Sequence, residues 1–225
     1  MKLDTEITGI RKENGKFVLT TGDDEITTDY LINAAGLQAD VIASYLTPCE
    51  HTIHPRKGEY FVLSHNARDY VHHVIYPIPT AKGKGILAVP TVDHNILLGP
   101  DSEPTDDRHA INNTSEGMAI LRRQLPSTLK NIPYPEIIRT FCGLRPSLST
   151  KDFVIEKSPR DDHMLNLIGI DSPGVASAPA IAEYVEELLD LPYPIKDRSP
   201  DTRLYQGSDL FIGKPSKEES SNDQI

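Results

Sequence analysis

The sequence predicts a mixed α/β fold in which two strand–helix units flank a β-rich insertion. Two supporting observations are the apolar runs "YLINAAG" and "LNLIGI", each of which leads through small residues towards a helical segment. The third is the region between them, where short β-branched runs are broken by Gly, Pro, Asp and Asn, as in antiparallel sheets with tight turns. We therefore expect residues 4–48 and 161–192 to share one sheet, and residues 50–155 to form a separate mixed or antiparallel sheet.

The N-terminal segment, residues 4–36, predicts three strands. The first two, "TEITGIR" and "KFVLTT", flank Asn14-Gly15, a pair typical of β-hairpin turns. The third, "YLINAAG", is continuously apolar, as expected of a strand buried on both faces. A helix is predicted to follow, and its spacing places one group of side chains on a single face: Leu37, Val41, Ile42 and Tyr45.

The insertion contains short candidate strands with one helix among them. The helix is "SEGMAILRRQL", which ends before Pro126. Beyond it, β character returns with "EIIRTFCGLRPSL" and again with "DFVIEKSP". The earlier strand-like runs are "GEYFVL", "VIYPIP", "GILAVPTV" and "NILLGP".

The second strand–helix unit predicts an amphipathic helix near the C-terminus. Ser177 fits the N-cap position and Pro179 fits the first turn. The expected buried stripe consists of Ile181, Val185, Leu188 and Leu189. Residues 196–225 predict a C-terminal extension, whose polar tail from about residue 214 is expected to be disordered or a linker.

Composition and charge argue against several classes of function. The 225 residues carry a formal net charge of -10, which argues against a sequence-independent nucleic-acid surface and against a basic membrane-binding patch. No apolar run reaches the ~20 residues needed to span a bilayer, and the N-terminus does not resemble a signal peptide. We expect a cytoplasmic protein, with peripheral membrane association of the full-length protein left open.

The cysteines and histidines do not indicate a metal site. Cys49 and Cys142 are isolated in the sequence and are expected to be free thiols. The histidines that lie near one another lack the H-x-x-x-H spacing or paired carboxylates of metal centres, and they are His51, His54, His72 and His73.

Several segments occur in an order and spacing that match one family. They are "YLINAAGLQAD", "RKGEYFVL", "GILAVPTVDHNILLGPD", "GLRPS" and "NLIGIDSPGVASAPAIA". Through them the chain resembles the C-terminal part of FAD-dependent oxidoreductases of the D-amino-acid-oxidase-like superfamily. The similar branch is that of the glycerol-3-phosphate dehydrogenase-like and L-2-hydroxyglutarate dehydrogenase-like proteins, and the resemblance covers roughly residues 4–192.

The resemblance implies a discontinuous, Rossmann-like FAD-binding domain, of which residues 1–48 and 161–195 are the distal βα units. Residues 49–160 would form the inserted, β-rich substrate-binding domain. The family's G-x-G-x-x-G turn for the FAD pyrophosphate, and the acidic residue for its ribose, do not occur in this sequence. We therefore expect FAD in the full-length protein and weak or absent FAD binding by this chain, which looks like a truncated protein or a partial gene product.

The resemblance also implies which residues contact the cofactor. The turn "GIDSPG" would face the isoalloxazine ring, and the helix after it would direct its N–H groups and partial positive charge at the flavin N1–C2=O edge. "NAAG" matches a cofactor-contacting strand end, with ordinary close packing of a strand on a helix as the alternative. The predicted cofactor residues are Ala34, Ala35, Gly36, Gly143, Leu144, Gly169, Ile170, Ser172, Pro173, Gly174 and Val175.

Substrate binding is predicted for Arg145 in "GLRPS", with Tyr60 and Arg56. A comparable arginine of the superfamily faces the substrate carboxylate over the flavin, and a guanidinium can form two parallel hydrogen bonds with a carboxylate or phosphate. The alternative for Arg145 is a surface or structural ion pair. For "HPRKGEY", the alternative is a turn at Gly58 with Tyr60 packed in the sheet.

These matches imply that the full-length protein oxidises a small anionic substrate, either a 2-hydroxy acid or glycerol 3-phosphate. Hydride would pass to flavin N5 while a base takes the hydroxyl proton. The sequence identifies neither the catalytic base nor the electron acceptor. The alternatives are an amine- or amino-acid-oxidising flavoenzyme, or a non-catalytic interaction or structural module as the isolated chain.

Overall fold

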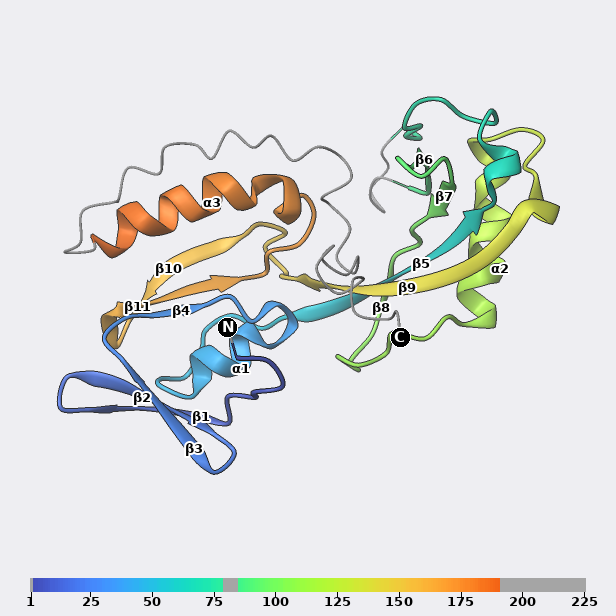
Figure 1. The fold of residues 1–225 in the computed structure, drawn as a ribbon. Helices are drawn as coiled ribbons and strands as arrows, with labels where there is room; N and C mark the ends of the chain where they lie inside the picture. Colours follow the sequence, from blue (N-terminus) through green and yellow to red (C-terminus); the bar gives the residue numbers. More distant parts are fainter. Residues whose placement is uncertain (1, 79–84, 191–225) are drawn as a thin grey trace, which may run out of the picture. The chain divides into compact units, whose positions relative to one another are not determined.

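Three β-sheets with helices packed against them make up the computed structural model, which describes residues 2–78 and 85–190 (Figure 1). The first sheet is an antiparallel meander of β1 (Gly9–Glu13), β2 (Lys16–Thr21) and β3 (Asp24–Thr28). Asn14 and Gly15 have φ angles of 50° and 80°, which is the geometry of the predicted hairpin turn. The N-terminal segment holds four strands rather than the predicted three, because the residues before "YLINAAG" pair with β2.

The second sheet joins the two predicted strand–helix units. β4 (Leu31–Asn33) pairs in parallel with β11 (Asp161–Ile168), which confirms that "YLINAAG" and "LNLIGI" share one sheet. β10 (Val154–Ser158) pairs antiparallel with β11, so the strand order is β10-β11-β4. The run "DFVIEKSP", expected in the insertion, belongs instead to this sheet, because Pro159 and Arg160 alone separate it from β11.

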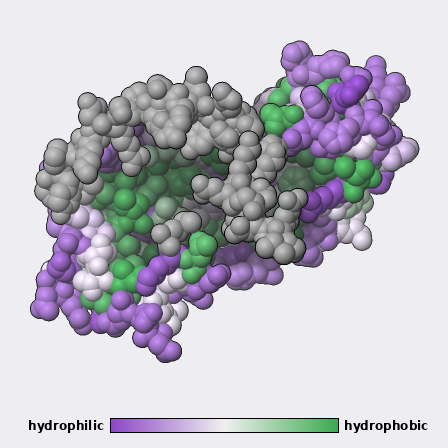
Figure 2. Space-filling model, viewed as in Figure 1, coloured by the Kyte–Doolittle hydropathy of each residue, from purple (hydrophilic) through white to green (hydrophobic). Residues whose placement is uncertain are grey.

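β4 is shorter and less buried than predicted. Helix α3 (Gly174–Leu189) packs on β11 through Leu165, Val185 and Leu189, yet the side chain of Ile32 is 48% exposed. On the face viewed in Figure 2, apolar side chains gather around β4, β10 and β11. The prediction of a strand buried on both faces is therefore wrong for Ile32, whose side chain the described residues leave about half exposed.

The helix after β4 buries a different face from the predicted one. A short 3-10 helix, η1 (Gly36–Gln38), leads into α1 (Ala39–Ser44). Val41 and Tyr45 are each 38% exposed, whereas Leu37 and Ile42 are partly buried as expected. The residues of α1 that are buried are Ala39, Asp40 and Ala43.

Asp40 explains why this face turns inward. Its carboxylate accepts a hydrogen bond from Ile53 N–H at 2.9 Å and pairs with the two terminal nitrogens of Arg108 at 2.6 and 2.7 Å. Burial acts to raise the pKa of Asp40, but the hydrogen bonds and charge of Arg108, together with Ile53 N–H, outweigh it and lower the pKa. Asp40 thus ties α1 to the start and to the middle of the insertion.

The third sheet is built on a long antiparallel pair, β5 (His54–Leu63) and β9 (Ile137–Ser147), which run side by side in Figure 1. All pairings in this sheet are antiparallel, as predicted for the insertion. The described part of "VIYPIP" forms only an isolated bridge, at Ile75. The other strands are β6 (Leu87–Pro90), β7 (Ile96–Gly99) and β8 (Glu103–Pro104).

Helix α2 (Ser115–Gln124) confirms the helix predicted in the insertion. Thr114 caps it, because Thr114 Oγ1 accepts from Gly117 N–H at 3.0 Å. Leu121 of α2 packs with Phe61, Leu63 and Leu98 in the core of this sheet. The remaining 3-10 helices are η2 (His65–Ala67), η3 (Leu125–Ser127) and η4 (Tyr134–Glu136).

Helix α3 begins earlier than predicted, at Gly174. Gly174 N–H bonds Asp171 O and Ser177 N–H bonds Pro173 O, so Ser177 is not the N-cap and Pro179 lies inside the helix. The predicted stripe is confirmed, with Val185 and Leu189 buried and Ile181 and Leu188 partly buried. The predicted extension, residues 196–225, lies outside the described residues. Among the described residues, no helix is long and apolar enough to cross a membrane.

Disrupting the Asp40–Arg108 pair should destabilise the protein markedly. We expect Asp40→Asn to lower the free energy of unfolding by about 2–4 kcal/mol, because it leaves a largely buried guanidinium without its counter-charge. Arg11→Gln, which breaks an exposed pair with Glu13 and Glu25, should change it little. Urea denaturation of both variants tests this. Equal losses of unfolding free energy would show that the Asp40–Arg108 pair stabilises the protein no more than an exposed pair does.

Candidate functional site

Three distant segments of the sequence meet beside the carboxyl ends of β4 and β11. They are the residues after β4, the end of β9, and the turn between β11 and α3. Ser147, the last residue of β9, donates a hydrogen bond to Asp171 Oδ2 in that turn. Leu148 packs with Ile168 of β11 in one buried cluster, and β9 also lies against η1. The strand that carries Arg145 is therefore adjacent to both segments predicted to contact a cofactor.

The backbone after β4 is open to contact from outside. Asn33 is 2% exposed, and its Nδ2 donates to Ala39 O at 2.8 Å and to Asn166 Oδ1 at 2.9 Å, which fixes the strand end. The exposed residues that follow are Ala34, Ala35 and Gly36. Gly36 has a φ of +56°, and no atom lies within 4 Å of the position a Cβ would take. A planar group can thus approach this backbone without meeting a large side chain.

The turn between β11 and α3 is shaped by its glycines. Gly169 has a φ of +71°, and a Cβ there would lie 2.5 Å from two atoms of Leu148, so the turn and the end of β9 touch only because residue 169 is glycine. A Cβ at Gly174 would lie 2.7 Å from Ile170, which is half-buried under the turn. The exposed residues of the turn are Ser172 and Pro173.

The N-terminus of α3 has unpaired N–H groups. The first-turn N–H groups of Gly174 and Ser177 have backbone acceptors, but within the described residues those of Val175 and Ala176 have none. Val175 is 94% exposed, so this end of the helix is not covered by the described residues. Unpaired N–H groups and the helix dipole together favour an electron-rich group at this point.

One face of the β5/β9 pair carries the predicted substrate residues, and we call it the arginine face. Residues directly opposite each other in an antiparallel pair point to the same side of a sheet. The register aligns Arg56 with Arg145, Gly58 with Gly143, and Tyr60 with Phe141, and we use the name arginine face for these six residues. The same side of the strand pair continues to His54 and Ser147 at one end and to Val62 and Arg139 at the other. Leu144, predicted with the cofactor residues, points to the opposite face beside Lys57.

No side chain covers the middle of the arginine face at Gly143. Gly143 is exposed, and no atom lies within 4 Å of the position its Cβ would take. The rings of Tyr60 and Phe141 stack at a centroid distance of 4.5 Å and an interplanar angle of 7°, forming an aromatic wall on one side. Gly58 lies within β5, so the alternative of a turn at this residue is wrong, whereas Tyr60 does pack in the sheet.

Arg145 is held by neutral acceptors. Its Nη2 donates to Asp101 O at 3.0 Å and to Lys57 O at 3.3 Å. A Cβ at Gly58 would lie 3.2 Å from this nitrogen, so the glycine leaves room for the guanidinium to cross β5. In the described part of the chain Arg145 has no carboxylate partner, which disfavours the alternative of an ion pair.

Arg56 is held in the same way. Its Nε donates to Ser102 Oγ at 3.0 Å and its Nη2 donates to Ser102 O at 2.8 Å. The acceptors of Arg56 and Arg145 thus belong to consecutive residues, Ser102 and Asp101. None of these acceptors is a carboxylate, so neither arginine forms an ion pair through them.

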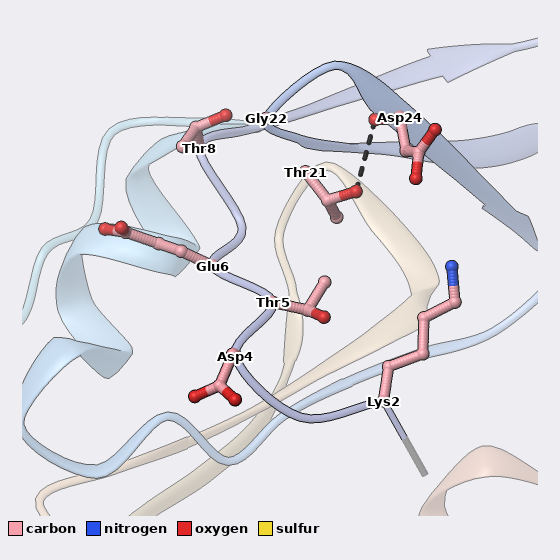
Figure 3. A pocket seen from close by; sticks show the side chains of 8 residues that line it. All are labelled: Lys2, Asp4, Thr5, Glu6, Thr8, Thr21, Gly22 and Asp24. Atoms are coloured by element: carbon pink, nitrogen blue, oxygen red, sulfur yellow. Dashed lines mark hydrogen bonds between the residues drawn. The ribbon is translucent and has the colours of Figure 1, made fainter.

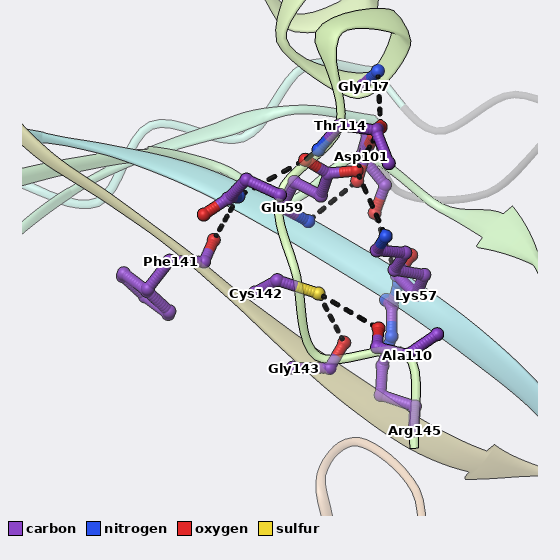
Figure 4. Close-up of polar contacts among 11 residues, drawn as sticks. Lys57, Glu59, Asp101, Ala110, Thr114, Gly117, Phe141, Cys142, Gly143 and Arg145 are labelled. Carbon is purple, nitrogen blue, oxygen red and sulfur yellow. Dashed lines mark hydrogen bonds and ion pairs between the residues drawn. The ribbon is translucent and has the colours of Figure 1, made fainter. Parts of the chain in front are cut away.

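The opposite face of β5 carries a buried polar cluster, drawn in Figure 4. Glu59 is 1% exposed and accepts from Thr114 N–H at 2.8 Å, Thr114 Oγ1 at 2.7 Å and Asn113 Nδ2 at 3.1 Å. Lys57 Nζ lies 3.7 Å from Glu59 Oε1. Burial acts to raise the pKa of Glu59, but these hydrogen bonds and the charge of Lys57 lower it overall. Glu59 therefore remains an anion that fastens the N-terminus of α2 to β5.

Asp101 lies between the two faces and is only partly satisfied. Its Oδ1 accepts from Glu59 N–H at 2.7 Å, while its buried Oδ2 has no hydrogen-bond partner within the described residues. Burial raises the pKa of Asp101, the neighbouring charges of Glu59 and Glu103 raise it further, and Arg145 acts in the opposite direction. The carboxyl group is thus shifted towards its neutral form while its main chain anchors Arg145.

Sequence patterns did not indicate Glu59, Asp101 or Ser102. "NILLGPD" and "GEYFVL" read as ordinary strand ends, although a charged residue inside an apolar strand such as β5 is a signal of a buried polar partner. Cys49 and Cys142 are free thiols, as predicted. Among residues 2–78 and 85–190, no group of His, Cys, Asp and Glu side chains could hold a metal ion.

A separate surface depression lies beside the first sheet and contains none of the predicted residues. Figure 3 shows its polar lining of mixed charge, which includes Lys2, Asp4, Glu6 and Asp24. Its hydroxyl and carboxylate groups come from the chain start and the β2–β3 turn. Nothing in this lining converges on a single ligand chemistry.

Comparison with known proteins agrees with this geometry. A family model described as "FAD dependent oxidoreductase" matches residues 1–188. The chain belongs to the FAD-dependent oxidoreductase family. This assignment accounts for an arrangement in which a strand end, a glycine turn and a helix N-terminus adjoin a β-rich insertion.

Within this family, the chain is similar to enzymes named for small anions. It is 37% identical over 187 residues to a glycerol 3-phosphate dehydrogenase of Caloramator mitchellensis, a match that covers 83% of this chain and 39% of the relative. It is 30% identical over 187 residues to a mitochondrial L-2-hydroxyglutarate dehydrogenase of Arabidopsis thaliana, covering 72% of this chain and 38% of the relative.

A solved FAD-dependent oxidoreductase has the same fold over most of the chain. It is the dithionite-reduced L-alpha-glycerophosphate oxidase of Mycoplasma pneumoniae with FAD bound, with a TM-score of 0.75 and 27% identity. The match covers 83% of this chain and 50% of that protein. The chain thus spans half, or less, of the length of these relatives.

Gly169→Ala should destabilise the protein through both its backbone and Leu148. A positive φ and an added methyl in contact with Leu148 should together cost about 2–4 kcal/mol of unfolding free energy. Gly143→Ala is the matched control and should be nearly neutral, because its Cβ would meet nothing. In urea denaturation, Leu148→Ala should partly relieve the Gly169→Ala defect, whereas strictly additive effects would show that the two residues do not touch.

Asp101→Asn should change how stability depends on pH. The pKa of Asp101 in the folded protein lies above its ordinary value of 3.8, so the folded wild type binds a proton at this carboxyl more tightly than the unfolded chain does. The wild type therefore loses stability as pH rises from 3.8 through the folded-state pKa. The variant lacks this loss, so its stability relative to wild type should increase as pH rises above 3.8. Urea denaturation of both proteins over a pH series tests this, and a pH-independent difference would contradict it.

Proposed function

We propose that the full-length protein oxidises a small anionic substrate with FAD, and that Arg145 binds the anionic group. The observation that carries this proposal is an arginine fixed by two backbone carbonyls, without a carboxylate partner in the described residues, beside the uncovered backbone of Gly143. Its Nε and Nη1 have no acceptor within the described residues and can donate to an anionic group, and such charge-assisted hydrogen bonds are stronger than neutral ones. The names of the similar enzymes, glycerol 3-phosphate and L-2-hydroxyglutarate dehydrogenases, support the same substrate class.

The residues of this chain fit one edge of a flavin. The open backbone of Ala34, Ala35 and Gly36 would lie against the cofactor, and the unpaired N–H groups of Val175 and Ala176 would face an electron-rich edge of the ring. When bound, FAD supplies the acceptor for a hydride. We still predict that this chain alone binds FAD weakly, because its sequence contains no G-x-G-x-x-G turn.

The arginine face would orient the substrate between a cation and an aromatic wall. Arg145 offers Nε and Nη1, which have no acceptor within the described residues, while Nη2 is held by the main chain. The stacked rings of Tyr60 and Phe141 would present an apolar surface to the substrate on the other side of Gly143. A small polar carbon skeleton fits between them over Gly143, where no side chain intrudes.

Replacing Arg145 in the full-length, flavin-loaded enzyme should impair turnover specifically. Arg145→Lys keeps the charge but loses the planar group that bonds two carbonyls through Nη2 and still offers Nε and Nη1 to the substrate. A lost charge-assisted contact of about 2–4 kcal/mol corresponds to a decrease in kcat/KM of roughly 30- to 1000-fold. Flavin content, read from the absorbance of the purified enzyme, should remain nearly unchanged.

The control variant is Arg139→Lys on the same strand, at an exposed position beyond the aromatic wall. It should retain nearly full activity. If Arg145→Lys instead lowered the melting temperature and left kcat/KM close to wild type, Arg145 would be a structural residue and the anionic-substrate proposal would lose its main support.

A further inference from the structure

We propose that Arg108 positions the cofactor turn, which we define as residues 34–38, and thereby sets how tightly the full-length protein binds FAD. This inference rests on the proposed function, in which the open backbone of residues 34–36 lies against the cofactor. The hydrogen bonds of Arg108 go instead to the carbonyl of Leu37 and to the start of α1. Arg108 therefore acts on the cofactor through the turn, as a positioning residue.

The cofactor turn has few contacts of its own to keep it in one shape. Its 3-10 helix η1 buries none of its residues and has no side-chain cap. Ala35 N–H donates to Asn33 Oδ1 at 3.3 Å, and Gln38 N–H donates to Ala35 O at 3.0 Å. Exposed backbone hydrogen bonds with little buried apolar surface mark a segment that opens locally at low cost. The shape of the turn therefore depends on contacts made from outside it.

Arg108 supplies such a contact at the end of the turn. Each terminal nitrogen of a guanidinium carries two hydrogens. Nη1 of Arg108 donates to Leu37 O and to Asp40 Oδ1, the latter at 2.6 Å, and lies 3.5 Å from Gln38 Oε1. Nη2 donates to Asp40 Oδ2 at 2.7 Å. One side chain thus bonds a carboxylate through both nitrogens and still holds the main chain of the turn.

Asp40 fixes the direction of this guanidinium. Its carboxylate is buried, and it also accepts from Ile53 N–H and from Val41 N–H, each at 2.9 Å. A fork bonded to both oxygens of a fixed carboxylate has one orientation. The Nη1 hydrogen that reaches Leu37 O is therefore aimed at the turn and does not move independently of α1.

The loop that carries Arg108 is itself attached to β5. Thr105 N–H donates to Pro55 O at 3.1 Å. Asp107 N–H donates to Thr105 Oγ1 at 3.2 Å, and His109 N–H donates to Asp107 Oδ1 at 2.8 Å. The main chain on both sides of Arg108 is thus fixed, so the arginine can hold the cofactor turn in place against the insertion.

The alternative is an ion pair that only stabilises the fold, and two variants distinguish the two roles. Asp40→Asn and Arg108→Gln break the same ion pair, so both should destabilise the protein. Asp40→Asn leaves Arg108 able to donate to Leu37 O, whereas Arg108→Gln removes that donor. An effect on the cofactor turn that follows Arg108→Gln more than Asp40→Asn therefore reports positioning and not stability.

The first test measures amide hydrogen exchange in the 225-residue chain by NMR. The reporting amides are those of Gln38 and Ala39, which donate within the turn, while amides of β2 report the loss of global stability. Arg108→Gln should speed exchange at the two reporting amides by about tenfold or more, and Asp40→Asn by at most about threefold. Arg11→Gln, which also removes an ion-paired arginine, is the matched control and should change neither amide.

The second test titrates FAD into the full-length apoprotein, well below the melting temperature of every variant. Arg108→Gln should raise the dissociation constant of FAD by about tenfold or more, whereas Asp40→Asn should stay within about threefold of wild type. Arg108→Lys covers the case in which Arg108→Gln does not fold, because it keeps a charge beside Asp40. A single ammonium does not reproduce the planar fork, so this variant should also bind FAD more weakly.

Equal losses of FAD affinity in Arg108→Gln and Asp40→Asn would make Arg108 a purely structural residue and overturn the inference. Faster exchange in the turn with unchanged FAD affinity would overturn it as well, because the turn would then not determine cofactor binding. Neither result would alter the proposal that Arg145 binds an anionic substrate, which the kinetics of Arg145→Lys decide separately.

Discussion

The antiparallel pairing of β5 with β9 is the constraint on which the rest of the site depends. Alternation along these two strands assigns each side chain to one of two faces with opposite chemistry. The centre of one face carries Arg56 and Arg145, two glycines and two aromatic rings, and the other face carries the buried Lys57–Glu59 pair that fastens α2. A shift of the register by one residue would bury the arginines under α2 and expose Glu59.

The loop after β7 positions the arginines of the β5/β9 pair. Asp101 and Ser102 hold Arg145 and Arg56 through their carbonyls, and the Asp101 side chain holds the main chain of Glu59. A few residues therefore fix both guanidiniums and the strand between them. Because the acceptors are carbonyls and the Ser102 hydroxyl, the arginines are ordered without an ion pair to a carboxylate.

Local patterns in the sequence predicted most elements of the fold, and the failures have physical causes. Asn14-Gly15, the helical run before Pro126 and the stripe on α3 are local signals, and the structure confirms them. The buried face predicted for α1 was wrong because Asp40 points inward to pair with Arg108, a partner far along the chain. The prediction that β10 belongs to the sheet of the insertion was wrong, because β10 forms a hairpin with β11 and so joins the sheet of β11.

The candidate site was predictable only in part for a similar reason. "GLRPS" and "GIDSPG" are short motifs that a family resemblance can locate, so Arg145 and the turn were found. The partners that define their chemistry, Asp101 and Ser102, have no motif of their own. They become visible only when the loop between β7 and β8 is folded against β5.

The contact of Leu148 with Gly169 has a mechanical consequence. Leu148 directly follows the strand that carries Arg145, and it fills the space that a side chain at Gly169 would need. Ser147 bonds Asp171 in the same turn. The end of β9 and the turn before α3 are therefore packed directly against each other, and neither can be repacked without a change in the other, since packed side chains resist compression.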